Sequence, residues 1–214
     1  MIQLIVNSGF VGAGIGLLFF AALGIVIERF LILSRASSDA ADFADEFDTA
    51  LQQGDEAAIE VCEDYGGDEG SGVPEVYRIA IEHRELGPAT LRNVLDNHIE
   101  LIVLPRLRAR LGLLGTIAKT APMLGLIGTV SGMIGAFSTI AGATGAGVNP
   151  AELAGDIGMA LGTTFLGLLV AIPVVFALTY LRARVEQLEI DLDRYSQKCI
   201  DTLFSISKPD IEPA

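Results

Sequence analysis

Two threonines stand among small residues in a long, nearly uncharged part of the chain. From Thr120 to Leu181 the charged side chains are Glu152 and Asp156. On a helical wheel, each of two segments there carries one face of small residues with a single hydroxyl. The faces are Gly125, Thr129, Gly132 and Ala136 in the first segment, and Ala160, Thr164, Gly167 and Ala171 in the second. Small residues let helices approach closely, and threonine can hydrogen-bond across the contact. The pattern leaves two alternatives: tight packing within a bundle, or a narrow pore or groove that holds a partner helix.

The elements that carry these faces must be long helices. A hydrocarbon core of about 30 Å is crossed by about 20 helical residues. Residues 120–181 are long enough for two crossings joined by a glycine-rich turn at 142–147, and residues 9–27 form a third segment without a charge. We therefore expect three membrane crossings in a lipid bilayer.

The charge distribution predicts how these crossings are oriented. All 14 lysines and arginines lie outside the apolar segments: none precedes Arg29, and none lies between Lys119 and Arg182. The positive-inside rule then predicts a multi-pass membrane protein in which the N-terminus and the turn at 142–147 face outward, and the C-terminus faces the cytoplasm. The formal net charge of −13 argues against a nucleic-acid partner, which requires clustered basic surface.

The pattern predicts an all-α membrane protein with long cytoplasmic helical extensions. Its expected parts are a first crossing in 1–34, a cytoplasmic insert in 35–110, a second crossing in 111–141, a periplasmic turn in 142–149, a third crossing in 150–181, and a cytoplasmic helix and tail in 182–214. Pro105 should kink the helix that leads into the second crossing without necessarily ending it. Asn149 and Pro150 predict the start of the third crossing.

The last helix continues past the membrane with a heptad seam. Apolar residues recur there at alternating spacings of three and four, namely Leu178, Leu181, Val185, Leu188, Leu192, Tyr195 and Cys199. Such a seam is typical of helix packing. We expect this part of the helix to pack against the insert or against a neighbouring copy.

Two motifs resemble a known family. Residues 121–134 read APMLGLIGTVSGMI, which is similar to the second-helix signature of the ExbB/TolQ/MotA ion-driven motor proteins. Residues 156–164 read DIGMALGTT and residues 167–173 read GLLVAIP, which resemble the third-helix signature of that family. The size and the three crossings resemble ExbB or TolQ more than the four-crossing MotA branch.

The resemblance implies a homopentamer around the membrane helices of a dimeric partner. That partner is an ExbD/TolR-like single-span protein whose transmembrane aspartate binds the ion, and a TonB-like protein is a further expected partner. The resemblance implies pore-lining roles for Gly125, Thr129, Gly132, Ala160, Thr163, Thr164 and Gly167, and helix bends near Pro122 and Pro173. The expected ion is H⁺, or alternatively Na⁺, and no cofactor is expected.

Three residues depart from the family pattern. Met159 stands where many ExbB and TolQ proteins carry a glutamate. Thr163 stands where some proton-type members have alanine, so its hydroxyl could help to coordinate Na⁺ or could hydrogen-bond a carbonyl of its own helix. Lys119 is a cation where small polar residues are common; it could extend toward the headgroups or form an electrostatic barrier at the inner mouth.

The residues themselves agree with a division of labour between two polypeptides. A proton relay in a membrane needs a titratable group. At the depth where Thr129 and Thr164 are expected to lie, the chain supplies none. Asp156 and Glu152 lie near the outer end, where they could cap the helix and interact with its dipole, or load ions at the outer mouth.

The sequence contains neither a nucleophile–base set nor a phosphate-binding loop, so we do not expect an enzyme. The leading interpretation is therefore an ExbB-like channel subunit that energises TonB-dependent outer-membrane transport. A TolQ-like envelope-maintenance motor and a non-conducting membrane scaffold are the alternatives.

Overall fold

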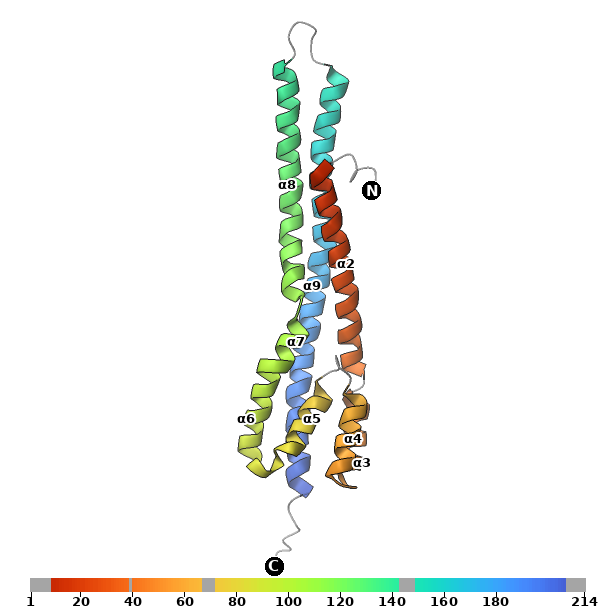
Figure 1. Cartoon of the computed structure of the whole chain (residues 1–214), viewed down its shortest axis with the longest axis vertical. Coiled ribbons are helices and arrows are strands. Elements are labelled where there is room, and N and C mark those ends of the chain that lie inside the picture. The colour runs from red at the N-terminus through yellow and green to blue at the C-terminus, as the bar shows by residue number, and fades with distance from the viewer. Residues whose placement is uncertain (1–8, 39, 67–71, 143–148, 207–214) are drawn as a thin grey trace, which may run out of the picture. The chain divides into compact units, whose positions relative to one another are not determined.

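The computed structural model describes residues 9–38, 40–66, 72–142 and 149–206, and every regular element in these ranges is helical (Figure 1). The all-α expectation is confirmed for these residues. The expected turn at 142–149 and the tail beyond residue 206 fall largely outside them.

Three long helices contain the apolar segments of the sequence. They are α2 (Gly9–Ser38), α8 (Leu111–Gly142) and α9 (Pro150–Ile206). By length and composition, three helical segments are able to cross a membrane: Phe10–Ser34, Pro88–Gly142 and Pro150–Ser205. The prediction of three apolar segments of sufficient length is confirmed.

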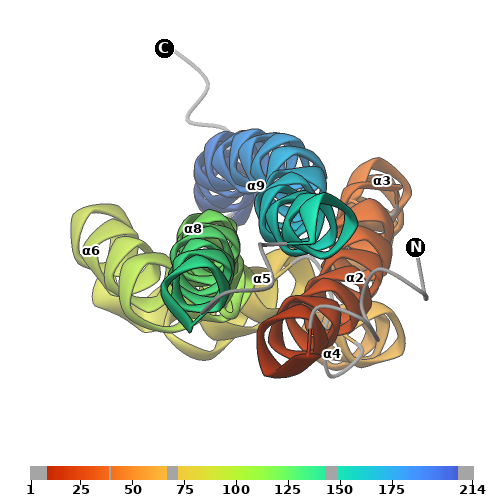
Figure 2. The same cartoon turned by 90° about the horizontal axis from the view of Figure 1, so that it is seen from above.

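The chain divides into two compact units, and we name each by its composition. The membrane unit comprises Met1–Ile27 and Arg110–Tyr180, and the polar unit comprises Glu28–Ala109 and Leu181–Ala214. In the membrane unit, α2, α8 and α9 lie side by side (Figures 1 and 2). A Cβ built at Gly14 of α2 would lie 3.9 Å from Leu124 Cδ1 of α8, so these two helices are in ordinary van der Waals contact.

The polar unit is built from short helices and the last part of α9. The short elements are α3 (Ala40–Leu51), α4 (Asp55–Tyr65), α5 (Val73–Glu82), the 3₁₀ turn η1 (Arg84–Leu86), α6 (Pro88–His98), the π-helical η2 (Ile99–Val103) and α7 (Leu104–Arg108). Large side chains fill its core, among them Phe43, Phe47, Tyr77, Leu91 and Leu95, each at most 1% exposed. Burying such side chains away from water is the main source of stability in a unit of this kind.

The heptad seam of α9 faces this core. Leu181, Val185, Leu188, Leu192 and Cys199 are each at most 3% exposed. Two ion pairs link α9 to the insert: Arg108 Nη2 lies 2.6 Å from Glu189 Oε2, and Lys198 Nζ lies 3.1 Å from Asp48 Oδ2. Within one chain, the seam therefore packs against the insert, which is the first of the two expected alternatives.

The helix before the second crossing ends, contrary to the expectation that it would continue through a kink at Pro105. The π-helical turn η2 precedes Pro105, and such a wide turn accommodates a proline that lacks an N–H and crowds the preceding carbonyl. Helix α7 then ends at Arg108, and α8 begins at Leu111. Between them, Arg110 adopts a φ of 63°, in the left-handed region that costs energy for a residue with a side chain.

The third crossing begins as its sequence predicts. Asn149 Oδ1 accepts a hydrogen bond of 3.1 Å from the backbone N–H of Ala151, and the helix starts at Pro150. Pro122 and Pro173 both lie inside uninterrupted helices. The expected bends near these two prolines stay a prediction.

Candidate functional site

Helices α8 and α9 touch along the two small faces that the sequence defines. A Cβ built at Gly125 would lie 3.0 Å from Thr164 Cα, and one built at Gly132 would lie 2.6 Å from Ala160 Cβ. A Cβ at Gly167 would lie 2.6 Å from the backbone oxygen of Ala121. The backbones therefore approach so closely that side chains at these glycines would collide.

This geometry bears on the two alternatives for the small faces. Gly125, Ala160 and Gly167 are buried, and Gly132 is half-buried. The contact between α8 and α9 of the same chain accounts for the small size of these residues. A pore-lining role for them stays a prediction.

Three threonines gather around one backbone carbonyl at the centre of this contact. The hydroxyls of Thr129, Thr163 and Thr164 lie 3.1, 3.2 and 3.0 Å from the oxygen of Gly125. Thr129 and Thr164 also hydrogen-bond to each other, so the two hydroxyls that the sequence singles out do meet. We call Thr129, Thr163, Thr164 and the Gly125 carbonyl the threonine cluster.

The members of the threonine cluster differ in their access. Thr163 is 3% exposed, and its hydroxyl lies 2.7 Å from the carbonyl oxygen of Ala160 in its own helix. Thr129 and Thr164 are half-buried. A hydroxyl has one proton to donate and two lone pairs that accept. The cluster therefore offers more acceptor sites than protons, and its two half-buried members leave one edge accessible.

The charged residues named as possible mouth residues lie away from the threonine cluster. Lys119 on α8 is exposed and precedes Thr129 by ten residues, about 15 Å along a helix. Glu152 is exposed in the first turn of α9, and Asp156 is half-buried one turn later. The described parts of α2 up to Ile27, of α8 after Lys119 and of α9 from Ile157 to Leu181 carry no charged side chain. The threonine cluster thus has no titratable group at its own level within the described chain.

Sequence reasoning missed one contact residue and one cavity. Gly128 lies against Thr163, and a Cβ built there would lie 2.6 Å from the Cβ of that threonine. The sequence could have shown this, because Gly128 follows Gly125 by three residues and so lies on nearly the same face of the helix. The cavity, of about 260 Å³, lies in the membrane unit, where Asp156, Met159 and Thr163 contribute to its lining.

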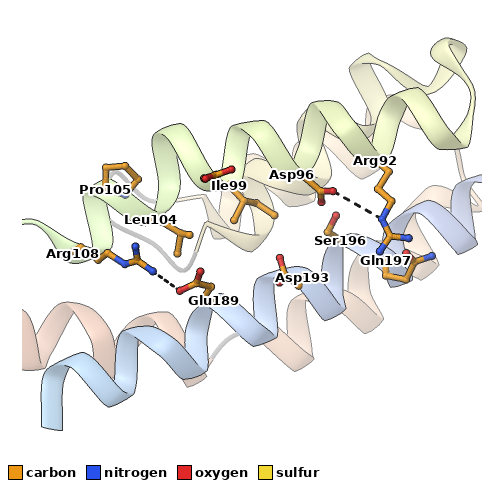
Figure 3. A pocket seen from close by; sticks show the side chains of 11 residues that line it. Arg92, Asp96, Ile99, Leu104, Pro105, Arg108, Glu189, Asp193, Ser196 and Gln197 are labelled. Atoms are coloured by element: carbon orange, nitrogen blue, oxygen red, sulfur yellow. Dashed lines mark hydrogen bonds and ion pairs between the residues drawn. The ribbon is translucent and has the colours of Figure 1, made fainter. Parts of the chain in front are cut away.

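A second cavity, of about 410 Å³, lies in the polar unit (Figure 3). Asp96 on α6 and Asp193 on α9 stand on its two walls, and Arg108 pairs with Glu189 at one end. Burial raises the pKa of Asp193 above its usual value, and the charges of Asp96 and Glu189 raise it further. The cavity is thus polar and predominantly acidic.

The two cysteines are buried in the polar unit, as free thiols. Cys62 is 3% exposed and Cys199 is 1% exposed. Burial raises the pKa of Cys62 to about 12 and raises the pKa of Cys199 as well. Because the thiolate is the reactive form, both thiols should be inert near neutral pH. No group of three or more His, Cys, Asp or Glu side chains that could hold a metal occurs among the described residues.

Comparison with known proteins identifies the class of the molecule. The family model described as the MotA/TolQ/ExbB proton channel family matches residues 71–194. This range covers more than half of the chain and includes the whole threonine cluster. The protein belongs to the MotA/TolQ/ExbB proton channel family and is a membrane protein. A search of the curated proteins gave no match.

Proposed function

We propose that this chain is the channel-forming subunit of an ion-driven motor in a bacterial inner membrane. The observation that carries the proposal is the threonine cluster: hydroxyls gathered at a helix contact deep in the membrane unit, without a titratable group at that level. Ion flow past these hydroxyls drives one part of the assembly to move against another. The available energy is about 2.3 kcal/mol per charge for each 100 mV of membrane potential.

The missing carboxylate comes from a partner. A relay without its own titratable group is incomplete, and polar groups inside a membrane bundle act in pairs. The partner we propose is a dimeric, single-span ExbD/TolR-like protein with a transmembrane aspartate, enclosed by a homopentamer of this chain. Thr129 and Thr164 are the half-buried members of the threonine cluster, so they are the ones that face this aspartate.

The branch of the family that we propose is ExbB-like. In that role the motor energises TonB-dependent transport across the outer membrane, with a TonB-like protein as the output. The three apolar segments of the described residues support an ExbB-like or TolQ-like branch over a four-crossing one. The distribution of lysine and arginine supports a periplasmic N-terminus and a cytoplasmic polar unit. A TolQ-like role in envelope maintenance uses the same machinery with another output.

A non-conducting scaffold is the second candidate, and one observation favours it. Gly125, Gly128, Gly132 and Gly167 are all occupied in contacts within the chain. A scaffold requires such contacts and has no need of accessible hydroxyls. The two functions therefore differ in whether the hydroxyls at the edge of the threonine cluster contact an ion or only support the packing of α8 on α9.

The deciding experiment replaces one hydroxyl by a methyl group of the same shape. Thr164→Val should assemble with the partner but lose ion flux at least about tenfold, because a hydrogen bond to a charged species contributes about 1.5–3 kcal/mol. Thr164→Ser should retain the flux. Flux is measured in vesicles that contain this chain and its co-expressed partner, and assembly is measured by co-purification.

The matched control is Thr179→Val on the same helix. Thr179 is exposed, and its hydroxyl donates to the Val175 carbonyl of its own helix at 2.9 Å. This variant should conduct normally. Full flux in Thr164→Val would reject the threonine cluster as the ion path, whereas the absence of flux even in the parent protein with its partner would favour the scaffold.

The transported ion is H⁺ or Na⁺, and Thr163 is the residue that tests the choice. Its hydroxyl has a carbonyl partner in its own helix, which is one of the two roles that its sequence position allows. If Thr163 also coordinates Na⁺, Thr163→Ala should lower the flux that a Na⁺ gradient drives and spare the flux that a pH gradient drives. An equal effect on both would assign Thr163 to packing.

A further inference from the structure

Asp156 lines the cavity of about 260 Å³ in the membrane unit and is the charged residue of that lining. The walls come from α2, through Val11, and from α8 and α9. Ser131 and Thr139 of α8 add two hydroxyls. We call this space the Asp156 cavity.

The register of α8 against α9 places an open position beside the carboxylate. Gly128 lies against Thr163 and Gly132 lies against Ala160, so the helices run antiparallel. One further turn brings Asp156 level with Gly135. A Cβ built at Gly135 would meet no atom within 4 Å, which leaves open space next to Asp156.

Among the residues that the structure describes, Asp156 has no cationic partner. It forms no hydrogen bond or ion pair with the residues that the structure describes, and it lies six residues, about 9 Å, into α9. A carboxylate without a cationic partner, in a unit that is otherwise apolar, requires water or a cation. The lining of the cavity is mixed, with Ser131, Thr139 and Asp156 as polar groups, and the cavity is large enough for several water molecules.

The inner end of the Asp156 cavity reaches the threonine cluster. Thr163 lines the cavity, and its hydroxyl lies 3.2 Å from the Gly125 oxygen that Thr129 and Thr164 share. Glu152 lies four residues before Asp156, so both acids share one face of α9, with Glu152 nearer the helix start. Glu152 and Asp156 thus lie between the start of α9 and the threonine cluster.

We propose that the Asp156 cavity is a loading site for a hydrated monovalent cation, H₃O⁺ or Na⁺. The Asp156 carboxylate attracts the cation, and the hydroxyls of Ser131 and Thr139 replace part of its water. The cation then passes to the threonine cluster. This role rests on the proposed function, since a loading site serves a conducting subunit.

Charge-selective labelling tests the site without requiring a working motor. Gly135→Cys places a thiol in the cavity, and the native Cys62 and Cys199 are buried. The purified protein in vesicles is treated with a cationic and an anionic methanethiosulfonate reagent, from each face in turn. Asp156→Asn should lower the ratio of cationic to anionic rates at residue 135 about tenfold, as expected for loss of one nearby charge. The ratio cancels any effect of Asp156 on the thiol itself.

Gly142→Cys is the matched control. Gly142 also lies on α8 in open space, but seven residues further along, about 10 Å away. Its ratio should change less than about twofold, because such a distance exceeds the screening length at physiological salt. An unchanged ratio at residue 135 would overturn the loading site. The loading site would also be overturned if the thiol at residue 135 reacted from neither face of the membrane while the thiol at residue 142 reacted.

A second measurement links the site to ion flow and identifies the cation. With the partner present, Asp156→Asn should raise the half-saturating ion concentration about tenfold, whereas Thr164→Val lowers the flux at every concentration. The half-saturating concentration is measured once with a Na⁺ gradient at fixed pH and once with a pH gradient without Na⁺. The gradient for which Asp156→Asn raises this concentration identifies the cation. A shift in neither would reject the loading role. If Thr164→Val conducts fully, the threonine cluster is not the ion path and the proposed function loses the observation that carries it, while the labelling ratio still reports on the cavity.

Discussion

The two units of this chain hold their helices together in opposite ways. In the polar unit, Phe43, Phe47 and Tyr77 pack as an aromatic cluster, with ring centroids of Phe47 and Tyr77 4.6 Å apart and those of Phe43 and Tyr77 5.2 Å apart. In the membrane unit, glycines form the contact between α8 and α9, while Phe137 and Phe165 are 62% and 60% exposed. Aromatic rings therefore form the core of the polar unit, whereas Phe137 and Phe165 of the membrane unit lie at its periphery.

The difference follows from the solvent. In water, each square ångström of buried apolar surface stabilises the fold by about 25 cal/mol, so large side chains are most effective inside. In lipid, an apolar side chain gains little by leaving the hydrocarbon, and helices associate through close packing and hydrogen bonds. Glycine permits that approach, and it also brings the threonine hydroxyls within reach of a carbonyl.

Removing a large side chain from the polar unit should have the largest effect. Phe47 is 0% exposed, so Phe47→Ala should lower the free energy of unfolding by about 3–5 kcal/mol through lost burial and a new cavity. Thermal unfolding followed by circular dichroism measures the loss. Leu86→Ala, at a 48% exposed residue of the same unit, should cost less than about 1 kcal/mol. Equal costs would contradict the contrast between the units.

Adding a side chain at the glycine contact is the reverse experiment. Gly167→Val should destabilise the membrane unit by about 1–3 kcal/mol, because the new Cβ would collide with the backbone of Ala121, which cannot rotate away. Gly155→Val on the same helix is the control, since its Cβ meets nothing within 4 Å. Size-exclusion profiles and melting temperatures in detergent compare them. If both variants behave alike, close approach is not what holds α8 to α9.

These contacts show what the sequence could and could not predict. The long apolar helices, the heptad seam and the Asn149 cap follow from local patterns, and all are present. The small faces were visible too, but a face of small residues does not say what covers it. In the structure each covers the other within one chain.

Two further features do not follow from the local sequence pattern. The helix ends at Arg108 and not at Pro105, because a π turn accommodates the proline and Arg110 adopts a positive φ. These are backbone conformations that a proline by itself does not specify. The Asp156 cavity needs the register of α8 on α9, which no single segment contains, so it is a property of tertiary contacts.

A pair of hydroxyl deletions sharpens the comparison because the expected signs differ. The Tyr77 hydroxyl is buried without a hydrogen-bond partner among the described residues, whereas the Thr163 hydroxyl has two carbonyls within reach. Tyr77→Phe should therefore stabilise the protein by about 1 kcal/mol, and Thr163→Val should destabilise it by a similar amount. Melting temperatures of the two variants decide the matter. A shift of the same sign in both would mean that at least one of the two hydroxyls is not placed as described.

The smallest expected effect concerns charge in the acidic cavity of the polar unit. Burial and the nearby Asp96 and Glu189 raise the pKa of Asp193 in the folded state, so folding favours its protonated form. The stability that this proton contributes is fully present below the usual aspartate pKa of 3.8 and is lost as the pH rises through the raised value. At neutral pH the charged Asp193 therefore opposes folding, and Asp193→Asn should raise stability there. Because the site is partly exposed, the gain should be about 0.5 kcal/mol or less.

The pH profile separates this electrostatic effect from a change in packing. The advantage of Asp193→Asn over the parent should shrink as the pH falls from about 7 to about 4, because the parent then binds the proton itself. Glu186→Gln, at an exposed residue of the same helix outside the cavity, serves as the control for a neutralised surface charge. Denaturant unfolding at a series of pH values measures both. An advantage that stays constant with pH would show that the amide improves packing, and that the carboxylates of the acidic cavity do not repel one another.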